Sequence, residues 1–278
     1  MQNSKVKITI LVDNFAGDGL VSEHGLSFWI ETEDKHILFD TGQGGALKNN
    51  AHALDIDLGK TDMLVLSHGH YDHTGGIPDV LQMARNVKLY GHPGIIQPRY
   101  SMSNEEVKSI KMPRESMVAI DKLPREQLHW VRQPVLLSNT IGITGPIPRE
   151  TSFEDPGGPF YLDPRGKNAD FIDDDLALWI RKDDGLIVCV GCAHSGLVNT
   201  LKHIRYLNPG LRIRGIIGGF HLLNASRQRL DETIIALHVF ESDSVIPCHC
   251  TGDVAVTLLR EVLGDRVSYG TAGMTYEF

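Results

Sequence analysis

The chain has 278 residues, a length that suits one large α/β domain or two small ones. Apolar residues make up 41% of it, which allows a sizeable core and disfavours intrinsic disorder. The net charge is −8 and the Lys and Arg residues are scattered, so a broad nucleic-acid-binding face is disfavoured, although a local anion pocket is not excluded.

The sequence also bears on location. The apolar run from Ile8 to Val12 is too short for a secretory segment, and no later run could span a bilayer. Four cysteines are too few for a disulfide scaffold in a chain of this size. We therefore expect a cytoplasmic protein without membrane contact.

Short apolar runs alternate with helical patterns in the first third, which favours a layered α/β fold. The turn-forming Glu33-Asp34 indicates a hairpin between two of the predicted strands. The predicted strands are Val6–Val12, Leu26–Glu31, Lys35–Phe39, Thr61–Leu66 and Val87–Tyr90, and a helix is predicted near Ala46–Ala53.

Residues from about 97 to 168 have recurring prolines and weak periodicity. Long irregular segments in compact domains often cover sites, so we expect an inserted or covering segment within a single domain of residues 1–278. Short helices are predicted around Asn104–Ile110 and Asp121–Leu128.

Regular patterning returns after this segment. Lys182-Asp183-Asp184-Gly185 is a predicted turn between two strands, and Asn208-Pro209-Gly210 ends the helix that follows them. The predicted strands are Leu176–Ile180, Leu186–Val190, Ile213–Ile217 and Ser244–Pro247, and the predicted helices are Leu197–Leu207, Arg227–Phe240 and Asp253–Leu263.

The strongest chemical signal is His68-Gly69-His70-Tyr71-Asp72-His73, directly after a buried strand. Imidazole suits zinc and related ions, and a nearby carboxylate adds a hard ligand. An extended backbone projects His68 and His70 to one side, whereas Asp72 and His73 follow where the chain turns. The motif can therefore seed two adjacent metal positions, and a polar loop with surface histidines is a poor explanation for it.

Together with Leu38-Phe39-Asp40-Thr41-Gly42, this motif resembles the metallo-β-lactamase superfamily. Other segments are similar to one subgroup of this superfamily, which is often labelled 7,8-dihydropterin-6-yl-methyl-4-(β-D-ribofuranosyl)aminobenzene 5'-phosphate synthase. These segments are Asp13-Asn14, Glu23–Ser27, Gly191–Gly196, Gly218–His221 and Cys248–Gly252. The resemblance implies a four-layer αββα sandwich with metals along one edge of the paired sheets.

By the same resemblance, His68 and His70 would bind a first metal ion, and Asp72 and His73 a second. Asp40 would orient a ligand imidazole by accepting its other N–H. The ions would be one or two divalent metals, zinc first, with manganese or iron as alternatives.

The chain departs from the family pattern in two places. The loop Ile143–Pro148 has no third histidine, and the bridging aspartate that usually ends the next strand is absent before Cys192-Ala193-His194. We expect His194 to replace the missing ligand, with Cys192 a softer candidate. The number of ions bound therefore stays open.

Further positions are assigned by their place after strands or in the covering segment. His249 would be the last metal ligand, and His221 would act in catalysis by contacting substrate oxygens. His24, Arg149 and Lys167 are candidates for substrate contact. Cys189 lies within an apolar strand, so it is interpreted as a buried core residue and not as part of a structural zinc site.

The function expected from these residues is metal-dependent hydrolysis of a small, anionic phosphoester, as in phosphodiesterases, or of a lactone or other acyl substrate. Asp72 would orient the nucleophile or carry its proton. The alternatives are a pterin-pathway synthase, a di-iron oxidoreductase, which His70 disfavours because such members carry glutamate there, and a metal-binding protein without catalysis. An RNA-processing nuclease is disfavoured by the acidic charge.

Overall fold

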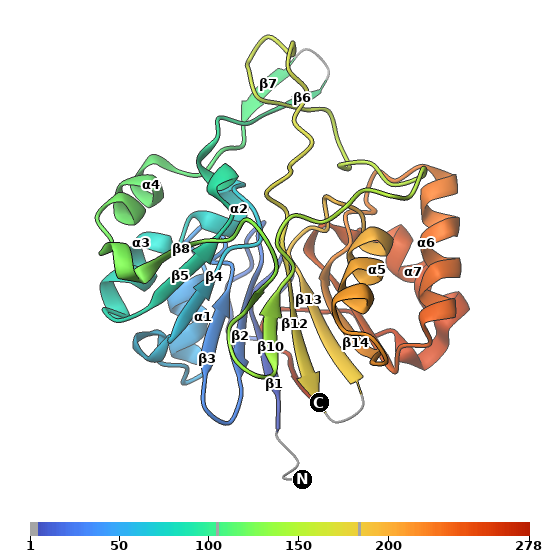
Figure 1. Cartoon of the computed structure of the whole chain (residues 1–278), viewed down its shortest axis with the longest axis horizontal. Helices are drawn as coiled ribbons and strands as arrows, with labels where there is room; N and C mark the ends of the chain where they lie inside the picture. Colours follow the sequence, from blue (N-terminus) through green and yellow to red (C-terminus); the bar gives the residue numbers. More distant parts are fainter. Residues whose placement is uncertain (1–4, 104–105, 183–184) are drawn as a thin grey trace.

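Two β-sheets pack face to face through the centre of the computed structural model, which describes residues 5–103, 106–182 and 185–278 (Figure 1). The first sheet contains, in spatial order, β16 (Thr275–Glu277), β1 (Lys7–Val12), β2 (Ser27–Glu31), β3 (His36–Phe39), β4 (Met63–Val65), β5 (Lys88–Gly91) and β8 (Leu128–Trp130). The second contains β15 (Ser244–Cys248), β14 (Arg212–Gly219), β13 (Gly185–Val190), β12 (Ala177–Lys182), β10 (Ile141–Ile143) and β9 (Val135–Leu136).

Helices cover the outer face of each sheet (Figure 1). Those on the first sheet are α1 (Leu47–Ala53), α3 (Ile77–Met83) and α4 (Arg114–Asp121), and those on the second are α5 (Leu197–Leu207), α6 (Arg227–Phe240) and α7 (Asp253–Leu263). The remaining helical elements of the described residues are short. They are α2 (Tyr71–Thr74) and the 3₁₀ helices Leu58–Lys60, Pro93–Ile96, Arg125–Gln127, His249–Thr251 and Gly264–Arg266. Within the described stretches, no helix is long and apolar enough to cross a membrane.

Three buried clusters hold these layers together. The central cluster lies between the sheets, where Phe28 and Phe39 stack with ring centroids 6.1 Å apart and Leu178 and Ile217 come from the opposite sheet. The other two clusters join each sheet to its own helices. The order of layers is therefore helix, sheet, sheet, helix, which confirms the predicted αββα sandwich.

Most predicted elements are present with ends within about two residues, but two predicted helices are wrong. In place of a helix at Asn104–Ile110, the described part forms the strand β7 (Glu106–Ser109); Asn104 and Glu105 lie outside the described residues. No single helix spans Asp121–Leu128: α4 ends at Asp121, Pro124 disfavours helical backbone at the residue before it, and only the 3₁₀ helix Arg125–Gln127 lies within the predicted range. Asp183 and Asp184, from the predicted turn, also lie outside the described residues.

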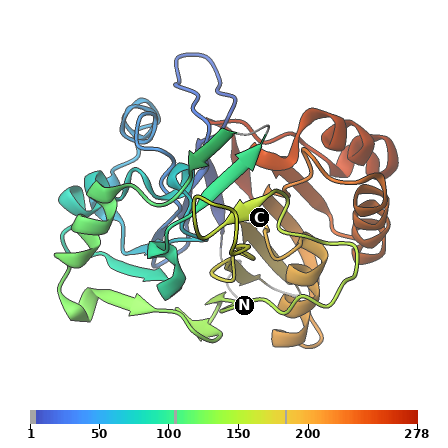
Figure 2. The same cartoon turned by 90° about the horizontal axis from the view of Figure 1, so that it is seen from above.

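Residues 97–168 contribute to three sheets. The strands β8, β9 and β10 extend the two main sheets, whereas β6 (Tyr100–Ser103), β7 and β11 (Phe160–Tyr161) form a small sheet of their own. Figure 2 shows this small sheet above the line where the main sheets meet. The segment therefore lies over one edge of the sandwich.

The same edge receives the carboxyl ends of the parallel strands. In the first sheet β3, β4 and β5 run parallel, and in the second β13, β14 and β15 do. Parallel neighbours end at a common edge, so the residues that follow them are brought together although they are far apart in sequence.

Candidate metal centre

The backbone at the strand ends is unusual. Four non-glycine residues there have positive φ angles: Asp40 (60°), Ala193 (50°), His221 (48°) and His249 (49°). Side chains disfavour this left-handed region, and such conformations cluster at functional sites because the surrounding structure must hold them. Each follows closely after a strand, so the strand ends fix where the neighbouring side chains point.

His68 and His70 project into the centre of the cluster, with His68 Nε2 2.9 Å from His70 Nδ1. On its other side, His68 Nδ1 lies 2.9 Å from Ser67 Oγ. Gly69 between them donates its N–H to Asp174 Oδ2 at 2.8 Å, and a Cβ atom at this position would come 2.2 Å from the Ile95 carbonyl oxygen. Only glycine fits there, so the two imidazoles are held by a tightly packed turn.

His73 contacts the buried carboxylate of Asp40. Its Nδ1 lies 2.7 Å from Asp40 Oδ2, and Asp40 also accepts hydrogen bonds from the backbone N–H and the hydroxyl of Ser67. The opposite ring nitrogen, His73 Nε2, lies 3.1 Å from Cys192 Sγ. The buried carboxylate thus fixes the ring so that Nε2 faces the cluster.

Asp72, His24 and His249 form the more open side of the cluster. Asp72 Oδ2 is 3.1 Å from His24 Nε2 and 3.5 Å from His249 Nε2. His249 Nδ1 lies 2.8 Å from Asn14 Oδ1, while its backbone N–H donates to Asp13. As with His73, a partner on Nδ1 leaves Nε2 facing inward.

His194 lies beside the rings of His68 and His70. Its ring centroid is 4.7 Å from that of His68 and 4.9 Å from that of His70. Its Nδ1 donates to the Pro156 carbonyl oxygen at 2.7 Å. His221, which follows the end of β14, packs edge-on against His194, and their ring centroids are 4.4 Å apart.

The arrangement fits a metal ion. Within the described residues, His70 Nε2, His194 Nε2 and both ring nitrogens of His221 are buried without a hydrogen-bond partner, a costly state that a bound cation would relieve. Donor atoms also converge: four overlapping triads each have their three ligand atoms within 4.8 Å of one another. These triads are His68–Cys192–His194, His73–Cys192–His249, Cys192–His221–Cys250 and His24–Asp72–His249.

The charge states of His68, His70 and His194 suit metal binding. Burial and the neighbouring imidazoles lower the pKa of His68 and His194 well below the usual value. Burial, followed by the Arg99 charge, does the same to the pKa of His70. These rings are neutral at pH 7, and the neutral imidazole is the form that binds a metal.

His73 and Asp72 behave differently because they face opposite charges. Burial alone would lower the pKa of His73, but the carboxylates of Asp40 and Asp72 raise it to about 9. Burial alone would raise the pKa of Asp72, but His73 and the hydrogen bonds from His24 and His249 hold it well below its usual value. Asp72 is therefore an ionised carboxylate at neutral pH.

The four cysteines divide into two pairs. Cys189 and Cys248 belong to the apolar cluster between the sheets, in agreement with the core interpretation of Cys189. Cys192 and Cys250 instead line the cavity at the cluster, with their Sγ atoms 3.3 Å apart. Burial raises the pKa of Cys192; for Cys250 the hydrogen bond with Cys192 and the charge of His221 outweigh burial and lower the pKa.

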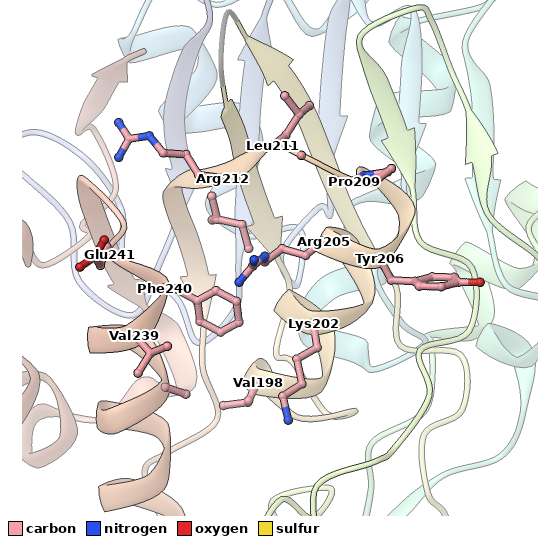
Figure 3. Close-up of a pocket in the computed structure, with 13 residues that line it drawn as sticks. Val198, Lys202, Arg205, Tyr206, Pro209, Leu211, Arg212, Val239, Phe240 and Glu241 are labelled. Carbon is pink, nitrogen blue, oxygen red and sulfur yellow. The ribbon is translucent and has the colours of Figure 1, made fainter.

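A cavity of about 220 Å³ opens onto the cluster. The covering segment contributes part of its wall, including Lys108, Gly157 and Phe160. A larger hollow of about 820 Å³ lies between α5 and α6, where Arg205 lies over the Phe240 ring (Figure 3). It contains none of the clustered histidines, so the chemistry belongs to the smaller cavity.

Two predicted substrate contacts lie elsewhere. Arg149 donates to the backbone carbonyl oxygens of His194 and Phe171, so its charge is used in holding the His194 loop. Lys167 is exposed in a turn capped by Asp163 and does not line the cavity. Of the lysine and arginine residues that the structure describes, Lys108 lines the cavity, and its Nζ donates to Tyr71 Oη at 3.0 Å.

The chain is similar to known proteins over most of its length. A family model described as the metallo-beta-lactamase superfamily matches residues 22–207. The 7,8-dihydropterin-6-methyl-4-(beta-D-ribofuranosyl)-aminobenzene-5'-phosphate synthase of Methanocaldococcus jannaschii is 31% identical over 98% of this chain and 97% of its own length. An uncharacterized protein of the same organism is 32% identical over 96% of this chain and 98% of its own.

A solved structure is similar over the same extent. Tm1679, described as a metal-dependent hydrolase of the β-lactamase superfamily, has a TM-score of 0.81 and 26% sequence identity. The match covers 98% of this chain and 99% of that one. Both sequence and fold are therefore similar over nearly the whole chain.

Proposed function

Because the chain belongs to the metallo-β-lactamase superfamily, we propose that it is an enzyme that uses one or two divalent metal ions to act on a small anionic substrate. The observation that carries this proposal is the set of buried, unpartnered imidazole nitrogens on His70 and His194 beside the ionised Asp72. Such an arrangement costs stability unless a cation satisfies it.

His68, His70 and His194 would hold one ion, and Asp72, His73 and His249 the other. A divalent ion held there supplies Lewis acidity and lowers the pKa of a coordinated water toward 7. Imidazole ligands favour zinc, with manganese or iron as alternatives. The protein keeps the ligand rings in place through groups behind them: Asp40, Ser67, Asn14 and the Pro156 carbonyl.

The cavity wall indicates what the substrate carries. Phe160 lies with its ring centroid 5.5 Å from that of His70, and Tyr71 also lines the cavity, with the Lys108 ammonium 4.9 Å from its ring centre. Aromatic side chains favour a flat ring in the substrate, and an exposed ammonium favours a phosphate. These residues therefore support a substrate that combines an aromatic group with an anionic one.

The reaction we propose is the bond-forming one named for the M. jannaschii relative, in preference to the hydrolysis that the sequence alone favoured. That relative is 31% identical over nearly the full length of both chains. The product in its name joins a dihydropterin, through its 6-methyl carbon, to an aminobenzene that carries a ribose phosphate. Flat rings and a phosphate are the features that Phe160, Tyr71 and Lys108 suit. The amine nitrogen of the aminobenzene would form the bond to the 6-methyl carbon, a phosphate or diphosphate on that carbon would leave with the bonding electron pair, and Asp72 would accept the proton that the amine loses.

Hydrolysis of a small phosphoester or of a lactone is the second candidate function. The observation that favours it is the full-length similarity to Tm1679, which is described as a metal-dependent hydrolase. In this case the nucleophile is water, and the cavity residues have the same roles.

The test is product analysis with the zinc-loaded protein. We would supply 4-(β-D-ribofuranosyl)aminobenzene 5'-phosphate with a 7,8-dihydropterin whose 6-methyl carbon carries a phosphate or diphosphate, and follow the products by mass spectrometry. The joined product is expected. Release of phosphate without joining would favour the hydrolase, and no turnover of these compounds or of a phosphoester and lactone panel would overturn both candidates.

Asp72→Ala provides the matching test of the site. We expect it to abolish turnover while a cooperative thermal unfolding transition remains, because Asp72 lines the cavity and the apolar clusters between and behind the sheets are left intact. Turnover at the wild-type level would contradict the assignment of Asp72.

A further inference from the structure

Three adjacent strands bring two thiols and an imidazole to one point beside the histidine cluster, where all three line the cavity. Cys192 follows β13, His221 follows β14, and Cys250 lies two residues after β15. These strands are parallel neighbours, with Val190 beside Gly218 and Gly219 beside Cys248 in the register. The three side chains therefore converge because of the sheet itself, although they span 58 residues between Cys192 and Cys250.

The three ligand atoms are within 4.8 Å of one another. Both nitrogens of His221 are buried and lack a hydrogen-bond partner within the described residues, and the two thiols have 3% and 7% exposure. The close approach depends on Gly219, where an added Cβ would come 2.6 Å from Cys250 Sγ. The missing side chain of Gly219 thus leaves a space that the thiol of Cys250 fills.

Cys192 also connects this point to the rest of the cluster. Its Sγ belongs to three of the four converging triads, one with His68 and His194 and one with His73 and His249. The distance from Cys192 Sγ to His73 Nε2 is 3.1 Å. Among the triads formed by the described part of the chain, no other donor atom is shared so widely, so Cys192 lies where a ligand could serve more than one ion.

We propose that Cys192, Cys250 and His221 form a sulfur-containing metal subsite that adjoins the imidazole–carboxylate cluster. Within it Cys192 is shared with the histidine ligands, and His221 is a ligand in place of the predicted substrate contact. The inference rests on the proposed metal-dependent function, and it restricts which metal ions the site would bind. Thiolates favour zinc and other soft ions, whereas manganese and magnesium prefer oxygen ligands.

X-ray absorption spectroscopy at the zinc edge tests this on the wild-type protein, reduced and reconstituted with zinc. Sulfur scatterers at about 2.3 Å are expected beside nitrogen or oxygen at about 2.0–2.1 Å. A shell of nitrogen and oxygen alone, with zinc fully bound, would overturn the sulfur subsite and leave the proposed function standing. Absence of bound zinc would overturn both.

Cobalt substitution then assigns the sulfur to residues. The wild type is expected to show a near-ultraviolet charge-transfer band from thiolate to cobalt, and Cys250→Ser is expected to lose about half of its intensity. Cys192→Ser should lose at least as much, whereas Cys189→Ser is the matched control, because that buried thiol faces the core between the sheets. An unchanged band in folded Cys192→Ser and Cys250→Ser would contradict the proposal; if either fails to fold, the zinc-edge result on the wild type decides.

Discussion

Replacement of Arg99 tests whether a buried ion pair stabilises the turn that carries His68 and His70. This side chain is 1% exposed, and its guanidinium donates two hydrogen bonds to the carboxylate of Asp174, one of them 2.9 Å long. Its Nε lies 3.0 Å from Asp170 Oδ2. Because Asp174 in turn accepts the N–H of Gly69, the ion pair connects the covering segment to the turn that carries His68 and His70.

Arg99→Met keeps most of the side-chain length and removes the charge, which leaves two buried carboxylates without their cation. Removal of one partner from a buried ion pair costs about 3–5 kcal/mol. That is a large part of the roughly 5–15 kcal/mol that stabilises a typical domain. We therefore expect a large loss of stability together with weaker metal binding.

The assay is urea unfolding of the wild type, Arg99→Met, Asp174→Asn and the double variant. The double variant should be less destabilised than the sum of the single changes, since the uncompensated charge is removed with its partner. Arg227→Met is the control, because Arg227 pairs with Asp231 on the exposed surface of α6, and no measurable change is expected. A loss below about 1 kcal/mol in Arg99→Met would refute the reasoning.

Three further changes test separate parts of the account. Asp40→Asn should weaken zinc affinity by about 10- to 100-fold in a chelator competition assay, because it removes the carboxylate behind His73, whereas Asp57→Asn on the exposed surface should not. Ser226→Ala should lower unfolding stability by about 1 kcal/mol by removing the cap of α6, and Ser226→Asp should preserve it. Burial raises the pKa of Asp243, but hydrogen bonds from Arg214 and Arg212 lower it overall. The carboxylate therefore stabilises the fold above its unfolded pKa near 4, so Asp243→Asn should cost less than about 1 kcal/mol at pH 7, and this cost should shrink as the pH falls through the lowered pKa of the folded state.

The histidine motif could be recognised in the sequence because its imidazole and carboxylate groups lie within six residues of one another, directly after an apolar strand. His194 and His249 could be placed for a related reason, since each follows an apolar strand whose end is recognisable. The αββα layers followed from the alternation of apolar strands and helical patterns, and α5, α6 and α7 begin and end where they were predicted.

Other parts of the site arise only from contacts between distant segments. Asn14 orients His249 across 235 positions, and Cys250 meets Cys192 only because β13 and β15 both flank β14. Lys108 was missed because its strand has charged residues and no clear alternation, which gave the impression of a short helix. Arg149 was misplaced for the opposite reason: a cation in an irregular segment suggested substrate binding, but backbone carbonyl groups satisfy it.

The presence of metal among these side chains is the claim from which the rest follows. An anomalous-difference map at the zinc edge, from crystals of protein purified with zinc, tests it most directly. A peak is expected within coordination distance of His68, His70 and His194, with a second toward Asp72, His73 and His249. A map without an anomalous peak among those residues, from protein saturated with zinc, would contradict the account.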